Sequence, residues 1–118
     1  MKQKILICDD EEGVVESLKL ITGELYEAVV AHNGKDALSA IEADSEIRLV
    51  LLDIKMPQKS GLEVLKELKA RNPGIPVIII TGYQSVEAAA EAIKYGAANY
   101  IVKPLDTKSV LDAIAKAL

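Results

Sequence analysis

The sequence lacks Trp and Phe and has one Cys and four Tyr among 118 residues. A single Cys excludes an internal disulfide and is typical of a reducing compartment. Because aromatic residues are so few, the core has to be built from aliphatic side chains. Half of the residues are hydrophobic, which is sufficient to form the core of one domain. We therefore expect one domain over residues 1–118.

The chain also lacks a basic cluster and a long hydrophobic run, and its net charge is −4. An acidic domain without a patch of Lys and Arg is poorly suited to contact nucleic acid or an anionic membrane directly. Its apolar runs fall short of the ~20 residues that span a bilayer. The apolar run near the N-terminus is too short for a signal peptide. We expect a cytoplasmic domain.

What the sequence does contain is a regular alternation of two kinds of segment. Short apolar runs rich in β-branched residues predict strands at 4–8, 26–32, 48–53, 76–81 and 99–103. The segments between and after them carry apolar residues at helical spacing. Five strands alternating with five helices predict an α/β domain with a parallel sheet covered by helices on both faces.

The helical spacing selects one apolar face for each helix. The residues expected on these faces are, in chain order, Val14, Leu18, Ile21 and Leu25; Leu38 and Ile41; Leu62, Leu65 and Leu68; Val86, Ala89, Ala90 and Ile93; and Val110, Leu111, Ile114 and Leu118. Gly23 and Gly96 are candidate stops for the first and fourth helices, and "NPG" at 72–74 follows the third.

The hydrophobicity of the strands indicates their order in the sheet. Strands covered on both faces are continuously apolar, and the first, third and fourth segments are the most apolar. The doubly wound order 2-1-3-4-5 places these three in the centre and keeps the crossovers right-handed. The first and third strands then become neighbours, and the carboxyl ends of this pair form the switch point where such sheets bind ligands.

Polar residues end four of the predicted strands: Asp9 and Asp10, Asp53, Thr81 and Lys103. These side chains are expected to converge on one rim of the sheet. Two carboxylates ~5 Å apart repel by roughly 3 kcal/mol at an effective dielectric constant near 20. A bound divalent cation would relieve this repulsion, and oxygen ligands favour Mg²⁺. The rim is therefore a candidate magnesium site.

Each of these residues also has a simpler interpretation when it is taken alone. Asp9 and Asp10 could cap the first helix, and Asp53 could be a turn residue. Thr81 could cap the fourth helix, and Lys103 could be a solvated surface charge. Chance placement of all five at one edge of the sheet is the weaker explanation.

The motifs "ILICDDEE", "LVLLDIKMPQKSG", "VIIITGY" and "NYIVKPL" occur in this order across the chain. In order and spacing they resemble the receiver domain of bacterial two-component response regulators. The resemblance implies a flavodoxin-like (βα)5 fold and a phospho-accepting signalling switch in a phosphorelay. The segment "SVEAAAEAIKYGAANYIVKPL" resembles receivers attached to ATPase-type transcriptional activators.

The resemblance also implies a role for each residue at the rim. Asp53 accepts the phosphoryl group from a sensor histidine kinase or phosphotransfer protein. Mg²⁺ is held by Asp10, Asp53 and the backbone carbonyl of Lys55, while Asp9 acts through water. Lys103 contacts the phosphoryl oxygens.

Further positions are implied to transmit or tune the modification. Thr81 and Tyr100 relay it to a face formed by the fourth helix, fifth strand and fifth helix, which is also a candidate homodimer surface. The bond to Pro104 is expected to be cis. Lys55 and Tyr83 flank the phosphoryl group and are expected to slow its hydrolysis.

On this interpretation the domain modifies itself and is not a turnover enzyme. Two other classes stay open: a Mg²⁺-dependent phosphohydrolase or nuclease-like acid site, and a protein-interaction module that is not phosphorylated. A downstream output domain is compatible with the sequence.

Overall fold

The computed structural model describes residues 2–82 and 85–118 of the chain. Its elements, in chain order, are β1 (Gln3–Cys8), α1 (Glu12–Thr22), β2 (Tyr26–Ala31), α2 (Gly34–Ala43), β3 (Ile47–Leu52), α3 (Gly61–Arg71), β4 (Val77–Thr81), α4 (Val86–Lys94), β5 (Asn99–Val102) and α5 (Thr107–Ala117). The five strands form one parallel sheet in the order β2-β1-β3-β4-β5. The predicted fold and strand order are confirmed, and each strand boundary differs from its prediction by at most one residue.

The central strands are apolar throughout because each side of the sheet has its own hydrophobic cluster. Side chains alternate between the two faces, as the period of two in a β-strand requires. One cluster contains Ile5, Ile7, Leu49, Leu51, Ile78 and Ile80; the other contains Leu6, Cys8, Val50, Leu52, Val77 and Ile79. The edge strands β2 and β5 are only partly buried, as their mixed sequences predict.

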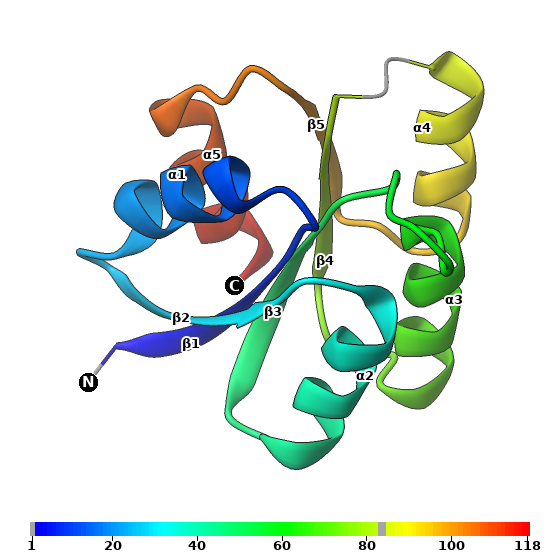
Figure 1. The fold of residues 1–118 in the computed structure, drawn as a ribbon, viewed down its shortest axis with the longest axis horizontal. Coiled ribbons are helices and arrows are strands. Elements are labelled where there is room, and N and C mark those ends of the chain that lie inside the picture. Colours follow the sequence, from blue (N-terminus) through cyan, green and yellow to red (C-terminus); the bar gives the residue numbers. More distant parts are fainter. Residues whose placement is uncertain (1, 83–84) are drawn as a thin grey trace.

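The helices divide between the two faces of the sheet. Figure 1 shows α1 and α5 on one side and α2, α3 and α4 on the other. The predicted C-terminal stops hold: α1 ends just before Gly23, α3 ends just before residues 72–74, and Gly96 follows α4 with a φ of +101°. This φ lies in the region that favours glycine.

Three predictions about helix faces were wrong. Leu118, expected on the face of the fifth helix, lies after the end of α5 and is 42% exposed. Leu25 lies after the end of α1 and is exposed, while Val15, which was not predicted to face inward, is buried. In α4 the predicted face contains Val86 and Ile93, which are 88% and 52% exposed. The buried positions of α4 are Ala88 and Ala92, so this helix packs on the sheet through small side chains.

The strand register brings the ends of β1 and β3 together. Cys8 and Leu52 are partners in the sheet, and the next residues along the two strands are Asp9 and Asp53. The amide of Asp53 donates a hydrogen bond to the carbonyl of Cys8 at 3.0 Å. Two acidic residues therefore leave adjacent strands at the same level.

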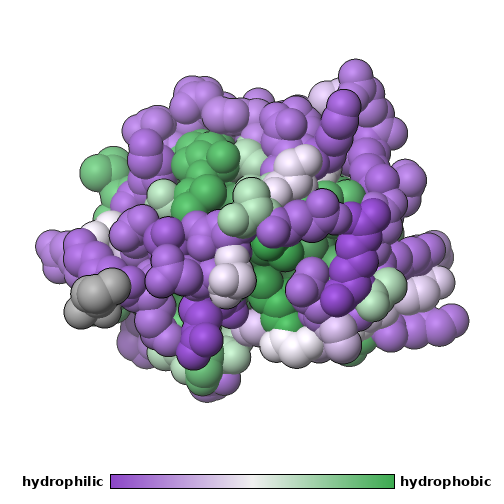
Figure 2. Space-filling view, turned by 90° about the horizontal axis from the view of Figure 1, so that it is seen from below, coloured by the Kyte–Doolittle hydropathy of each residue, from purple (hydrophilic) through white to green (hydrophobic). Residues whose placement is uncertain are grey.

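A wide cleft lies at the opposite, amino end of the strands. It has a volume of about 680 Å³ and is lined by residues that include Ile47, Arg48, Asn72 and Ile75. The surface seen from below in Figure 2 is largely hydrophilic, with apolar atoms in separate patches. Among the described residues, no helix has the length and apolar character needed to cross a bilayer. The closely spaced carboxylates and the ammonium group of Lys103 lie at the other end of the strands, at the acidic rim of the sheet.

The turn after β3 is tightly closed onto the backbone of Asp53. Gly61, the first residue of α3, donates its amide to the carbonyl of Ile54 at 2.8 Å. A Cβ at this position would lie 2.0 Å from the carbonyl oxygen of Asp53. Ser60 and Glu63 form a capping box at this end of α3, so the turn is anchored to the helix.

We predict that Gly61→Ala destabilises the fold by about 3 kcal/mol or more, because backbone atoms have to move to admit the methyl group. Gly13→Ala is the matched control, since a Cβ at Gly13 in α1 meets nothing within 4 Å. The control should leave stability unchanged or raise it by up to about 1 kcal/mol. Urea unfolding followed by circular dichroism measures both, and equal midpoints would contradict the close approach.

Candidate functional site

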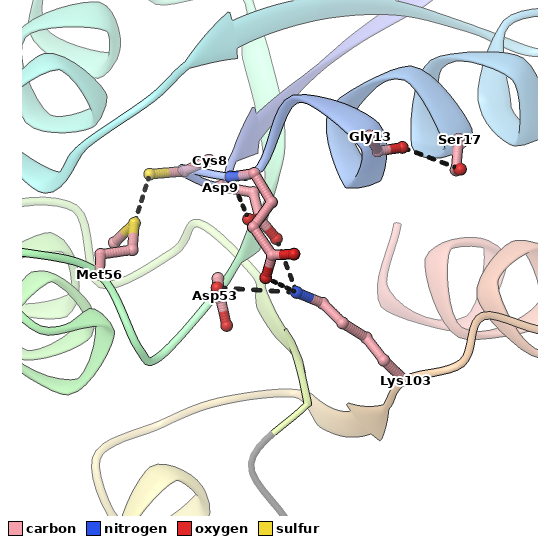
Figure 3. Close-up of polar contacts among 8 residues, drawn as sticks. Cys8, Asp9, Gly13, Ser17, Asp53, Met56 and Lys103 are labelled. Carbon is pink, nitrogen blue, oxygen red and sulfur yellow. Dashed lines mark hydrogen bonds and ion pairs between the residues drawn. The ribbon is translucent and has the colours of Figure 1, made fainter.

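Two buried carboxylates form the centre of the candidate site. Asp9 and Asp53 are 1% and 3% exposed, and Asp10 beside them is exposed. Both buried side chains point toward the ammonium group of Lys103, which reaches the rim from the loop after β5 (Figure 3). Oxygen atoms from Asp9, Asp10, Glu11 and Asp53 lie within 4.8 Å of one another.

Lys103 reaches this rim because the backbone fixes the position where β5 ends. The amide of Lys103 donates to the carbonyl of Thr81 at 2.8 Å, and the following bond to Pro104 is cis. Its Nζ donates a hydrogen bond to Asp9 Oδ2 at 3.1 Å. The same nitrogen lies 3.7 Å from Asp53 Oδ2 and 3.5 Å from Glu11 Oε1. One cation thus faces three carboxylates.

This arrangement changes the protonation equilibria of both buried partners. Burial lowers the pKa of Lys103, but the hydrogen bond to Asp9 and the charge of Asp53 outweigh this and bring it above its ordinary value. Burial raises the pKa of Asp9, although the hydrogen bond from the Glu11 amide opposes the change. The two shifts indicate a rim with excess negative charge that Lys103 compensates only in part.

Cys8 lies directly beneath the acids and belongs to the core. Its Sγ lies 3.7 Å from Met56 Sδ and 3.5 Å from the carbonyl oxygen of Asn33 (Figure 3 shows the Cys8–Met56 contact). Burial, together with the charge of Asp9, raises the pKa of the thiol to about 12. The thiol therefore stays protonated at neutral pH and is not a nucleophile.

A small cavity opens above the acids. It has a volume of about 190 Å³ and is lined by Glu11, Asp53, Lys55, Thr81, Gly82 and Lys103. Thr81, at the end of β4, is buried, and Lys55, two residues after Asp53, is exposed. The cavity has an acid at its floor, a hydroxyl and an ammonium group at its sides, and room for a small oxyanion.

Of the other residues predicted from the sequence, Tyr100 and Pro104 are not among those that line this cavity. Tyr100 is half-buried on β5 and packs against the cluster on the α4 side of the sheet. Tyr100 pairs with Ile79, and Thr81 is two residues after Ile79 on β4. The side chains of Tyr100 and Thr81 are therefore on the same face of the sheet. Tyr83 lies outside the described residues, and Pro104 is exposed.

Glu11 is the residue that the sequence reasoning left without a function of its own. It belongs to the acidic run that follows β1, but that run also contains Glu12, whose carboxylate instead lies 3.0 Å from His32 Nε2. The sequence offers no signal that separates the two. Only the position of Lys103, far along the chain, distinguishes Glu11 from its neighbour.

The donor set fits a hard divalent cation. Asp53 Oδ1 is buried and has no hydrogen-bond partner among the described residues, and such an atom is costly unless something binds it. The neighbouring oxygens that could contribute to such a site are carboxylate oxygens from Asp9, Asp10 and Glu11. Oxygen ligands of this kind favour Mg²⁺ over softer transition metals.

Comparisons with known proteins agree with this geometry. The family model described as "Response regulator receiver domain" matches residues 5–115. The transcriptional regulatory protein ZraR of Salmonella typhimurium is 41% identical over 118 residues, covering 99% of this chain and 26% of ZraR. The chain therefore spans about a quarter of the length of this curated relative.

Solved structures give the same result. A CheY-like receiver domain protein from Methanospirillum hungatei superimposes with a TM-score of 0.92 at 34% identity, covering 98% of this chain and 93% of that one. In the CheX–CheY–BeF3–Mg²⁺ complex of Borrelia burgdorferi, a matching chain has a TM-score of 0.91 at 29% identity, covering 96% of this chain and 87% of that one.

We predict that Mg²⁺ saturably raises the urea midpoint of the protein, because it binds the folded acids and not the unfolded chain. The free energy of unfolding should rise by about 2.7 kcal/mol when the free Mg²⁺ concentration is 100 times its dissociation constant. Asp53→Asn should abolish the dependence on Mg²⁺. Glu24→Gln, an exposed acid before β2 at the other end of the sheet, is the control and should keep it. A midpoint that ignores Mg²⁺ in the unmodified protein would contradict the metal site.

Proposed function

The chain belongs to the response regulator receiver domain family, whose members are phosphoacceptor switches of two-component systems, and we propose that Asp53 is the residue that accepts the phosphoryl group here. The observation that carries the proposal is that Asp53, which lines a small cavity, has a buried carboxylate oxygen with no hydrogen-bond partner in the described part of the chain. Because the members of this family are signalling switches, the two alternative functions, a Mg²⁺-dependent hydrolase and an interaction module that is not phosphorylated, are not favoured. We propose the whole of residues 1–118 as the receiver.

The proposed reaction is transfer of a phosphoryl group from a phosphohistidine of a partner kinase or phosphotransfer protein. An oxygen of Asp53 forms a bond to phosphorus while the phosphorus–nitrogen bond of the donor breaks, and the leaving imidazole returns to its neutral form. The product is an acyl phosphate, which water later hydrolyses. In this proposal the domain is itself the substrate: Asp53 is phosphorylated and is later restored by hydrolysis. The domain does not turn over other substrates.

Receiver domains bind Mg²⁺ at an acidic pocket, and we propose that Asp10, Asp53 and the backbone carbonyl of Lys55 are the direct ligands here. Asp9 acts through a water molecule in this proposal, since its side chain already bonds to Lys103. The bound cation supplies charge neutralisation between two anions. Phosphoryl transfer depends mainly on positioning and charge neutralisation, so few further groups are needed.

Lys103 and Thr81 are the proposed ligands of the transferred phosphoryl oxygens. The ammonium group of Lys103 already lies 3.7 Å from Asp53 Oδ2, and its raised pKa keeps it charged at neutral pH. The hydroxyl of Thr81 lines the same cavity. We also propose that Lys55 at the mouth, with Tyr83, obstructs water and prolongs the modification.

We propose that Thr81 and Tyr100 transmit the modification to the face formed by α4, β5 and α5. Phosphorylation adds about −1.5 to −2 charges at neutral pH, which draws the Thr81 hydroxyl inward and vacates space for Tyr100. The small buried residues of α4, Ala88 and Ala92, bury little area, so that displacing this helix costs little. The same face is the proposed surface for a homodimer.

The identity of the relatives suggests what the switch controls. ZraR is a transcriptional regulatory protein about four times longer than the matched region. We propose that this receiver acts in the cytoplasm on an output domain of the ATPase-type activator class, which would itself contact DNA. The receiver, with a net charge of −4, would not.

The central experiment is labelling with acetyl phosphate and Mg²⁺, followed by intact mass. The protein should gain one phosphoryl group, and Asp53→Ala should gain none. Asp112→Ala, which removes an exposed acid on α5, should label normally. Lys55→Asn should shorten the lifetime of the label. A label that persists in Asp53→Ala, or release of phosphate from esters without any label, would contradict the proposal.

The relay is tested by amide hydrogen exchange before and after labelling. Exchange should change over residues 85–101, which contain α4 and most of β5, and not over α2. Thr81→Ala should still accept the label but lose the change, because the hydroxyl is the first link. An unchanged 85–101 segment in the labelled protein would refute the relay.

A further inference from the structure

Glu11 occupies the N-cap position of α1 without capping the helix. Its φ and ψ are −94° and 115°, and its side chain makes no cap hydrogen bond. The N-cap residues of the other helices, Asn33, Ser60, Ser85 and Asp106, all accept a hydrogen bond from a backbone amide of their own helix. Glu is also absent from the residue types preferred at this position. Helix formation therefore does not explain the direction of the Glu11 side chain.

The Glu11 side chain is directed instead toward the cavity above Asp53. Its Oε1 lies 3.5 Å from Lys103 Nζ, and the residue lines the cavity together with Asp53, Thr81 and Lys103. Its side chain is 66% exposed, whereas that of Lys103 is 16% exposed. Glu11 is thus a solvent-facing acid at the mouth of the site, in contact with the cation that the transferred group requires.

We propose that Glu11 is a positioning residue that competes with the phosphoryl group for Lys103 and so limits the rate at which Asp53 is phosphorylated. The inference rests on the proposed function. In the unmodified protein Glu11 and Asp9 share the ammonium group of Lys103. When phosphoryl oxygens arrive, Lys103 has to turn to them, and its contact with Glu11 has to break.

The negative charge of Glu11 should also slow the phosphorylation of Asp53, as its contact with Lys103 does. A carboxylate at the mouth repels every anionic phosphodonor that enters the cavity. Because the side chain is largely exposed, the effect is screened by salt and is modest in size. The amide of Glu11 donates to Asp9 Oδ1 at 2.9 Å, and a side-chain substitution leaves this backbone bond in place. The competition can therefore be removed without dismantling the site.

The test compares Glu11→Gln with Glu12→Gln in labelling by acetyl phosphate, with Mg²⁺ held at saturation for each variant. Each variant loses one exposed negative charge from the same acidic run. In the described part of the chain, however, Glu12 pairs with His32, whereas Glu11 pairs with Lys103. The rate constant of Glu11→Gln should rise about two- to fivefold at low salt, the range of an exposed ion pair. The rate constant of Glu12→Gln should change by less than about 1.5-fold. The difference in rate constant between the two variants should become smaller as salt is added.

A second readout does not depend on the reaction. Calorimetric titration with beryllofluoride and saturating Mg²⁺ should show tighter binding to Glu11→Gln, since the analogue needs the same ammonium group. Equal rates and equal affinities in the two variants would overturn the inference. Failure of the unmodified protein to label at Asp53 would overturn the proposed function instead. Urea midpoints of the two variants should differ by no more than the loss of one exposed ion pair explains. A larger decrease of the midpoint, seen only in Glu11→Gln, would assign the residue to folding and refute the positioning role.

Discussion

The ammonium group of Lys103 among three carboxylates is the interaction on which the site depends. Asp9 and Asp53 are brought together by the register of β1 and β3, and the alignment of β5 with β4 brings Lys103 to them. One partly buried cation cannot neutralise the whole acidic run, and one buried oxygen of Asp53 has no hydrogen-bond partner among residues 2–82 and 85–118. The site therefore carries an excess of negative charge that a bound cation would neutralise, and the adjoining cavity has room for a small anion.

The sequence carries most of the information about the sheet because strand burial and strand order both follow from apolar content. The weaker predictions concern helices. The spacing of Val86 and Ile93 favours an inward face, yet α4 is buried through Ala88 and Ala92. Alanine scores weakly in any search for a hydrophobic stripe, although it permits the closest approach to a sheet. Leu25 was wrong for another reason: it lies beyond the stop at Gly23 that the same analysis identified.

The candidate site was predicted to the extent that it depends on strand ends. A residue that follows a strand is placed by topology alone, and this holds for Asp9, Asp53 and Lys103. Glu11 required the structure because its role depends on a contact with a side chain more than ninety residues away. The resemblance to receiver domains supplied the roles of Thr81 and Tyr100, which strand position alone does not assign.

The sheet separates the interior into two compartments, and this limits how a disturbance can spread. Tyr100 packs with the cluster beneath α4, while its neighbour Ile101 packs with the cluster beneath α5. Each central strand contributes side chains to both compartments, and the edge strand β5 does the same through adjacent residues. Its four residues thus connect the cluster beneath α4 with the cluster beneath α5 at the border of the sheet. A displacement of β5 would therefore alter the packing beneath both helices at once.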